Sequence, residues 1–526
     1  MNIENFPING EIIYQSGMPP MRRTENYQEE KMKKFIRLAS LAMAGLAVTA
    51  CLASCGDDSG KANETTATTT ASDSTSTVEQ VKDLYGSLDY TGQKFRILAL
   101  EAGQQWYTFI SDTANEVWFE DAGSDVLQKA IYERNDQTQK LLGIEITPVW
   151  GGGSDKIYER LIQDTAAGVD DYDVAFLSLA NALTAAQSGA TMNFNNTSTF
   201  DPEHSWWNQK FIKECTLYNE DLYAVAGALN IWDDCSNNCY IFNKDLLEKY
   251  DVAIPYDAVF DGTWTLDTLV EDIKKLTVDV NGDQEFDEND NWGIGTYGSG
   301  VSFALSGFDG GLAKMTDDGY PEIVCNNEIT IQKCKDWFDK VTNSECLYNQ
   351  GVNGTTSYED LFEQGQLAFG MTNLTHPFKL RNMNDEYGIL PEPKYNTDQA
   401  EYTSTVNTAF FTSYVLPKNC QDPDMAAACL EVMSGYSVDT LDDSLHTILF
   451  GSKLTRDQES RKVLTMISDT ISFDWAGIGG WNNGLGACFE MRQGSSFTLA
   501  SSLASTVDSA QEGLNAMLDA FASRQN

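Results

Sequence analysis

The chain is poor in the residues that carry most metal-dependent and nucleophilic catalysis. Of 526 residues only three are histidine, His204, His376 and His446, and none stands in an H-E-x-x-H pattern. A G-x-S-x-G elbow and a phosphate loop ending in lysine are absent as well. The motifs of the common metalloproteases, α/β-hydrolases and nucleotide-binding enzymes are therefore excluded.

Positive charge is equally scarce. Lysine and arginine number 35 against 78 aspartate and glutamate, which gives a net charge of -43. Such an excess repels nucleic acid and anionic lipid headgroups, so neither is expected as a partner. It suits a surface protein that faces neutral or cationic ligands, and it is also consistent with a role in solubility alone.

The cysteines lack the spacing of a redox or zinc motif. No C-x-x-C pair occurs among the 11 cysteines, and Cys235 to Cys239 and Cys325 to Cys334 define no disulfide connectivity. Exported chains often form disulfides, but free buried thiols are the preferred interpretation. Zinc is not indicated, because no ligand spacing typical of it appears.

Long hydrophobic runs are absent except for one near the N-terminus. Met32 to Arg37 is basic, Leu38 to Ala53 is uncharged, and Leu52-Ala53-Ser54-Cys55 follows. These are the parts of an export signal. The ending resembles the bacterial lipobox, which implies lipidation of Cys55 and a membrane tether. Cys51 fits the same pattern loosely. An uncleaved anchor helix is the alternative, but the run is shorter than the usual span of about 20 residues.

The segments on either side of this signal are polar. Residues 1–31 show no hydrophobic period, and we expect them to be an untranslated or disordered extension, with translation starting at Met32 and the signal peptide covering 32–54. Residues 55–83 are rich in serine and threonine and predict a disordered linker behind the lipid. The remaining body is then held at the extracellular face of the cell membrane.

Within the body, short apolar strands alternate with amphipathic helices. We expect strands at 94–100, 144–149 and 173–177, and helices at 124–142 and 156–167. This alternation predicts α/β layers around a largely parallel sheet.

Six segments of the body, in this order, resemble the landmarks of the extracellular solute-binding proteins, family 1, the maltose-binding-protein-like family. They are Tyr90–Leu98, Ala130–Asn135, Tyr240–Leu247, Gly262–Thr265, Phe362–Phe369 and Leu390–Lys394. The resemblance implies a two-lobed periplasmic-binding-protein-like α/β fold with a ligand cleft between the lobes. It also implies a monomer that binds a sugar, expected to be an oligosaccharide, and delivers it to the permease subunits of an ABC transporter.

On that resemblance the lobes are discontinuous. Residues 84–235 and 386–460 are expected in lobe 1, and 240–385 and 485–526 in lobe 2. The chain would cross between the lobes near 231–240, 385 and 460–485.

An acidic loop in the expected second lobe has the spacing of a calcium site. Oxygen-bearing side chains occupy relative positions 1, 3, 5, 9 and 12 of a twelve-residue loop, and the Glu285 carbonyl is available at position 7. Position 6 is glutamine, where glycine is preferred, and position 12 is aspartate, where glutamate is usual. The loop resembles a dockerin-type loop, and a structural Ca²⁺ is predicted on Asp279, Asn281, Asp283, Glu285, Asp287 and Asp290.

Flat apolar faces suit pyranose rings, and planar polar groups suit their hydroxyls. Several tryptophans stand beside polar residues, although core packing is the commoner fate of a tryptophan. We expect ligand contacts at the first crossing, in a glycine-rich loop near residue 480, and after the first strand; the residues are Trp106, Trp232, Asp233, Trp475 and Trp481. Trp264 is instead expected in the core, ahead of a helix capped by Thr265.

Two other function classes remain open. A secreted glycoside-active enzyme needs only two carboxylates, which an acidic chain always offers. A surface carbohydrate-binding adhesin fits the lipid and the linker but does not explain the landmarks.

Overall fold

The computed structural model describes residues 76–101, 116–296, 298–449, 457–482 and 484–524. All of them lie in one compact unit, Ser74–Asn526. The export signal, Cys55 and Trp106 fall outside the described residues. Among the described helices, none is both long and apolar enough to cross a membrane.

The first sheet has the strand order β2-β1-β3-β13-β4. Strand β1 (Lys94–Ala99) pairs in parallel with β2 (Glu145–Trp150) and β3 (Val174–Ser178), and β13 (Thr412–Pro417) returns antiparallel to β3 and to β4 (Thr191–Met192). The three predicted strands and their parallel pairing are confirmed. The late strand β13 makes the sheet mixed.

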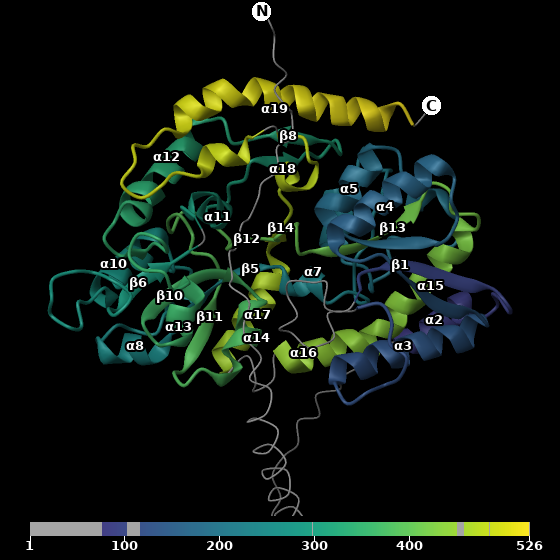
Figure 1. The fold of residues 1–526 in the computed structure, drawn as a ribbon, viewed down its shortest axis with the longest axis horizontal. Helices are drawn as coiled ribbons and strands as arrows, with labels where there is room; N and C mark the ends of the chain where they lie inside the picture. Colours follow the sequence, from purple (N-terminus) through teal and green to yellow (C-terminus); the bar gives the residue numbers. More distant parts are fainter. Residues whose placement is uncertain (1–75, 102–115, 297, 450–456, 483, 525–526) are drawn as a thin grey trace, which may run out of the picture. The chain divides into compact units, whose positions relative to one another are not determined.

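Helices cover this sheet (Figure 1). α3 begins after the N-cap Asp125, whose carboxylate accepts from Leu127 N and Gln128 N, and it ends at Gly143 with φ 69°. α15 is buried along its length and packs on α3 and α2. The helices of this part are α2 (Thr77–Tyr85), α3 (Val126–Leu142), α4 (Ser154–Ala167), α5 (Leu179–Gln187), η1 (Phe194–Asn196), α6 (Gln209–Cys215), α15 (Pro423–Ser437), the π-turn η4 (Val438–Asp442) and α16 (Asp443–Leu449).

The second sheet has the order β11-β5-β10-β6-β9. β5 (Asn238–Asn243) is antiparallel to both β10 (Leu367–Asn373) and β11 (Tyr387–Leu390), whereas β6 (Trp292–Gly295) is parallel to β10 and to β9 (Leu347–Tyr348). A separate hairpin joins β7 (Ala313–Met315) and β8 (Pro321–Ile323).

The helices around this sheet begin with local capping. Trp264 is fully buried, and Thr265 caps α10 in a capping box with Thr268, as the sequence predicts. The elements are α8 (Lys244–Lys249), α9 (Tyr256–Phe260), α10 (Leu266–Leu276), α11 (Val301–Gly307), α12 (Glu328–Trp337), the π-turn η2 (Phe338–Thr342), α13 (Tyr358–Glu363), α14 (His376–Lys379) and η3 (Leu380–Asn382).

The chain passes between the sheets through α7 (Trp232–Cys235) and again through β12 (Ser404–Thr405), which pairs with β14 (Ile471–Ser472). The second crossing lies later than the expected position near 385, because β11 still pairs with β5 in the second sheet. α17 (Gln458–Asp469) also packs on β11.

The C-terminal segment contacts both parts of the molecule instead of lobe 2 alone. It contains α18 (Trp475–Ile478), η5 (Gly486–Phe489) and α19 (Leu499–Ala522). Phe497 packs against Phe338 with ring centroids 5.6 Å apart, while Phe521 packs against Tyr223 at 5.0 Å. Figure 1 shows α19, in yellow, running from the side of α12 to the side of α5.

Every described cysteine is buried and free, as predicted. The residues are Cys215, Cys235, Cys239, Cys325, Cys334, Cys346, Cys420, Cys429 and Cys488.

Candidate functional site

A cavity of about 260 Å³ lies where the edges of the two sheets meet. On the second sheet, β5 begins at Asn238 beside the carboxyl end of β10, because the two strands are antiparallel. On the first sheet, Thr408 precedes β13 and so lies at the edge where β3 ends. Ligands of α/β proteins bind outside the carboxyl ends of strands, which makes this cavity the candidate site.

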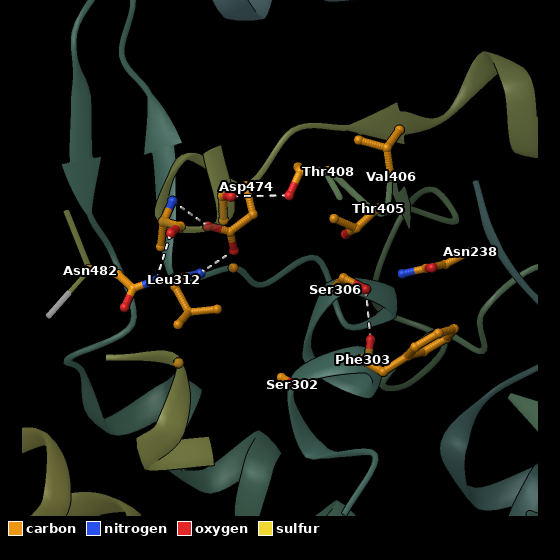
Figure 2. Close-up of a pocket in the computed structure, with 14 residues that line it drawn as sticks. Asn238, Ser302, Phe303, Ser306, Leu312, Thr405, Val406, Thr408, Asp474 and Asn482 are labelled. Atoms are coloured by element: carbon orange, nitrogen blue, oxygen red, sulfur yellow. Dashed lines mark hydrogen bonds between the residues drawn. The ribbon is translucent and has the colours of Figure 1, made fainter. Parts of the chain in front are cut away.

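One wall comes from the second sheet and the helix that follows β6. Asn238, Ser302, Phe303 and Ser306 line it, and Figure 2 shows the Asn238 amide pointing toward Ser306 and Thr405. The Ser306 hydroxyl lies 2.6 Å from Phe303 O and 2.8 Å from Glu392 Oε1. This wall therefore presents one aromatic ring and several short polar groups.

Glu392 supports that wall from behind. It is fully buried, and its Oε2 accepts from Thr405 N at 3.3 Å. Burial raises the pKa of Glu392 to about 8, although the bonds from Ser306 and Thr405 oppose the rise. Burial therefore favours the neutral form of this carboxyl, with Ser306 Oγ and Thr405 N as its hydrogen-bond partners.

The opposite wall belongs to α18 and the segment before β7. Asp474 Oδ2 accepts from Leu312 N at 2.6 Å, and its Oδ1 accepts from Ala313 N at 3.1 Å and Ala476 N at 3.0 Å. Burial raises the pKa of Asp474, and these N–H groups oppose the shift. Because three backbone donors hold its oxygens, Asp474 fixes the shape of this wall.

Two further polar side chains complete the lining (Figure 2). Thr408 Oγ1 donates to Gly477 O at 3.0 Å, and Asn482 Nδ2 donates to Ala476 O at 2.9 Å. Both bonds tie α18 to the second crossing and the loop beyond it. The amide oxygen of Asn482 also accepts from Gly484 N at 3.1 Å.

The first crossing is held by a different buried carboxyl. Glu116 Oε2 accepts from Ile231 N at 2.6 Å, and Thr412 Oγ1 lies 3.2 Å from both of its oxygens. Burial raises the pKa of Glu116 to about 8, partly offset by these bonds and by the Arg134 charge. Arg134, also buried, donates to Leu229 O at 3.1 Å and Glu116 O at 2.9 Å.

The structure does not gather the predicted ligand residues around the cavity. Trp232 and Asp233 are buried at the first crossing, 1% and 5% exposed. Trp475 is fully buried and donates to Glu214 O at 2.8 Å, so only its neighbours Ala476 and Gly477 reach the lining. Trp481 is buried too, and its Nε1 has no hydrogen-bond partner in the described part of the chain. A ligand role for these four residues stays a prediction that requires another conformation of the protein.

The predicted calcium loop has the backbone turn of such a site. Gln284, at the sixth position, has φ 69°, the left-handed conformation for which glycine is preferred there. Asp279 accepts from Gly282 N at 2.6 Å and Gln284 N at 2.9 Å, and the buried Asp290 accepts from Val280 N at 2.9 Å. The loop carboxylates bond to the loop's own N–H groups and do not converge as a set of three within 4.8 Å. Calcium stays a prediction.

The sequence analysis missed the residues that line the cavity. Ser302 and Ser306 are four residues apart, a spacing that puts both on one face of α11, and Thr405 and Thr408 follow a serine- and threonine-rich run. Short hydroxyl residues at such spacing are common on any surface. These residues can be told apart from other surface hydroxyl residues only in the folded protein, where α11, the second crossing and α18 come together.

Residues 133–435 match the model of a family described as bacterial extracellular solute-binding protein.

Among solved structures, the chain is similar to the ABC substrate-binding protein Lmo0181 from Listeria monocytogenes in complex with cycloalternan. The identity is 15%, 82% of this chain and 99% of that chain are covered, and the TM-score is 0.50. The maltose/maltodextrin-binding domain MalE from Bdellovibrio bacteriovorus bound to maltotriose is similar at 12% identity, with 82% and 100% covered and a TM-score of 0.45. The search of curated proteins found no match. The two-lobed α/β fold predicted from the sequence is confirmed.

Proposed function

Because the chain belongs to the bacterial extracellular solute-binding protein family, we propose that it captures an oligosaccharide between its lobes and delivers it to an ABC importer. The observation that carries this proposal is the cavity at the facing edges of the two sheets, lined by hydroxyl and amide side chains around one aromatic ring. The Listeria structure of the same fold holds a cycloalternan.

The lining matches the chemistry of a sugar. Hydroxyl and amide groups such as those of Asn238, Thr405 and Asn482 can exchange hydrogen bonds with sugar hydroxyls, and the Phe303 face can stack on a pyranose ring. The cavity volume of about 260 Å³ is just below the usual range for ligand pockets, about 300 to 1,000 Å³. An oligosaccharide would therefore enter with the lobes apart and be enclosed by a hinge movement.

Binding is favoured over hydrolysis. A glycosidase places two carboxyl groups about 5 to 9.5 Å apart on either side of the bond that it cleaves. Of the described residues that line the cavity, Asp474 is the single carboxylate, and three backbone N–H groups engage it.

The proposal is tested by calorimetric titration of the protein with a panel of oligosaccharides, together with an assay for released reducing ends. Phe303→Ala should weaken sugar binding by about 1 to 4 kcal/mol, the range for losing a packed aromatic anchor. Phe260→Ala is the matched control, since Phe260 lies at the end of α9, is 41% exposed and does not line the cavity. Turnover of a sugar would contradict transport, and equal binding by both variants would remove the cavity from the proposal.

We also propose that Cys55 carries a lipid that holds the protein at the outer face of the membrane. The support is the Leu52-Ala53-Ser54-Cys55 pattern after an uncharged run. A diacylglyceryl-type tether supplies two or more chains, which is enough for stable anchoring. Cys55→Ser should release the protein from sedimented membranes while Cys51→Ser should not. The reverse result would move the site to Cys51.

A further inference from the structure

Three metal-ligating side chains that are far apart in the sequence meet beside the first crossing. Asp234 lies in α7, Asp442 ends the π-turn η4, and His446 lies one turn further on in α16. One ligand atom of each lies within 4.8 Å of the other two. Asp442 and His446 are four residues apart, so both side chains project from the same side of their helical segment toward α7.

The distances between these atoms suit a shared cation better than direct hydrogen bonds. His446 Nε2 lies 3.4 Å from Asp442 Oδ1 and 3.8 Å from Asp234 Oδ2. Hydrogen bonds of this kind measure about 2.7 to 3.2 Å. Ligand atoms bound at about 2.0 to 2.1 Å to a tetrahedral metal are separated by about 3.3 Å, close to the observed spacing.

The charges around the cluster also favour a cation. Asp234 and Asp442 place two carboxyl groups within 4.8 Å of each other. The neighbouring Asp233 is buried beside them. A divalent ion would offset the repulsion between these carboxylates.

We propose that Asp234, Asp442 and His446 form a binding site for a divalent transition-metal cation of the zinc class. One imidazole and two carboxylates are ligands that Zn²⁺ accepts, with a water completing four-coordination. Their side chains are 28%, 29% and 47% exposed respectively, so an ion and its water can reach them. The ion would fasten the crossing helix α7 to η4 and α16.

The test uses Zn²⁺ alone as the probe. The untagged full chain is stripped with chelator, supplied with excess Ca²⁺ so that the loop at 279–290 does not compete, and titrated with ZnCl₂ by calorimetry. One Zn²⁺ should bind per chain and raise the melting temperature. His446→Ala and Asp442→Asn should each lower the Zn²⁺ affinity by about tenfold or more, as losses around metal sites do.

Asp443→Asn is the matched control, because Asp443 is an exposed acid on the same helix next to Asp442. It should bind Zn²⁺ as the wild type does. The melting temperature of each variant without metal shows whether it folds, and Asp442→His, which exchanges one ligand type for another, should keep binding. The proposal is overturned if the wild type binds no Zn²⁺, or if His446→Ala binds it as tightly as the wild type. In either case the three side chains form no metal site.

Discussion

The two crossings between the sheets differ in the size of the side chains that they bury. At the first crossing, the side chains of Trp232 and Asp233 are buried. At the second, Thr405, Val406 and Thr408 are small and leave the space that forms the cavity. A crossing with short side chains can therefore leave room for a ligand, whereas a crossing with large side chains is filled by its own packing.

A buried carboxyl holds the backbone of each crossing. Glu116 accepts from Ile231 N at the first, and Glu392 accepts from Thr405 N at the second. The Arg134 charge acts on Glu116, whereas the opposing influences on Glu392 are hydrogen bonds from Ser306 and Thr405. Burial raises the pKa of both carboxyls to about 8, and the crossings differ in that a buried arginine, Arg134, lies beside Glu116.

The largest effect should come from truncating a buried tryptophan. Trp232→Ala and Trp475→Ala should each lower the free energy of unfolding by about 3 to 5 kcal/mol, because both rings are packed on all sides. Urea denaturation measures this loss, and sugar titration is done on the same samples. A variant of normal stability that fails to bind sugar would restore the sequence-based interpretation of that ring as a platform.

Next in size is a pH effect that separates the two carboxyls. A carboxyl whose pKa rises from 4.5 to about 8 on folding binds its proton more tightly in the folded state. Its contribution to stability is fully present below about pH 4.5 and is lost as the pH rises through 8, on the order of a few kcal/mol. Stability measured from pH 5 to 9 should therefore fall.

The glutamine variants make this test specific. Glu392→Gln should flatten the pH dependence and match the wild-type stability most closely below about pH 4.5, where the carboxyl is protonated in the folded and the unfolded protein, since the amide imitates a neutral carboxyl. Glu116→Gln should flatten it too, but above about pH 8, where wild-type Glu116 ionises, it should also cost stability, because the buried Arg134 loses that acidic neighbour. Identical behaviour of the two variants would abolish the distinction between the crossings.

How far the sequence predicted this structure depends on the range of the interactions. β1, α3 and Thr265 were predictable because periodicity and capping are local. The cavity was not, since it requires α11, the second crossing and α18 to meet. The surroundings of Trp475 were not predictable for the same reason: glycines beside it indicate a loop, but its indole donates to the backbone oxygen of Glu214, which is distant in the sequence.

A third prediction concerns a loop outside both crossings. Removing Ca²⁺ with chelator should lower stability by about 2.7 kcal/mol if the ion is present at a hundredfold over its dissociation constant. Sugar affinity should stay constant, because residues 279–290 do not line the cavity. Thermal melts with and without chelator measure the effect, and Asp279→Asn should abolish it. An unchanged wild-type melt, with no metal found by elemental analysis, would remove calcium.

The smallest effects should come from two threonine-to-valine changes, one at each crossing. Thr412 is buried, and its hydroxyl bonds to Glu116 and accepts from Asn230 Nδ2 at 3.2 Å. Thr412→Val leaves the Asn230 amide without that acceptor in a buried place, which should cost about 1 to 3 kcal/mol of stability and leave sugar affinity unchanged.

Thr408 is half-buried, and water can replace its bond to Gly477 O. Thr408→Val should therefore cost only about 0.5 to 1.5 kcal/mol of stability but weaken sugar binding, since Thr408 lines the cavity. Denaturation measures the stability of each variant, and calorimetry measures its sugar affinity. If Thr412→Val instead weakened binding while Thr408→Val did not, the ligand would lie at the first crossing, as the sequence alone suggested.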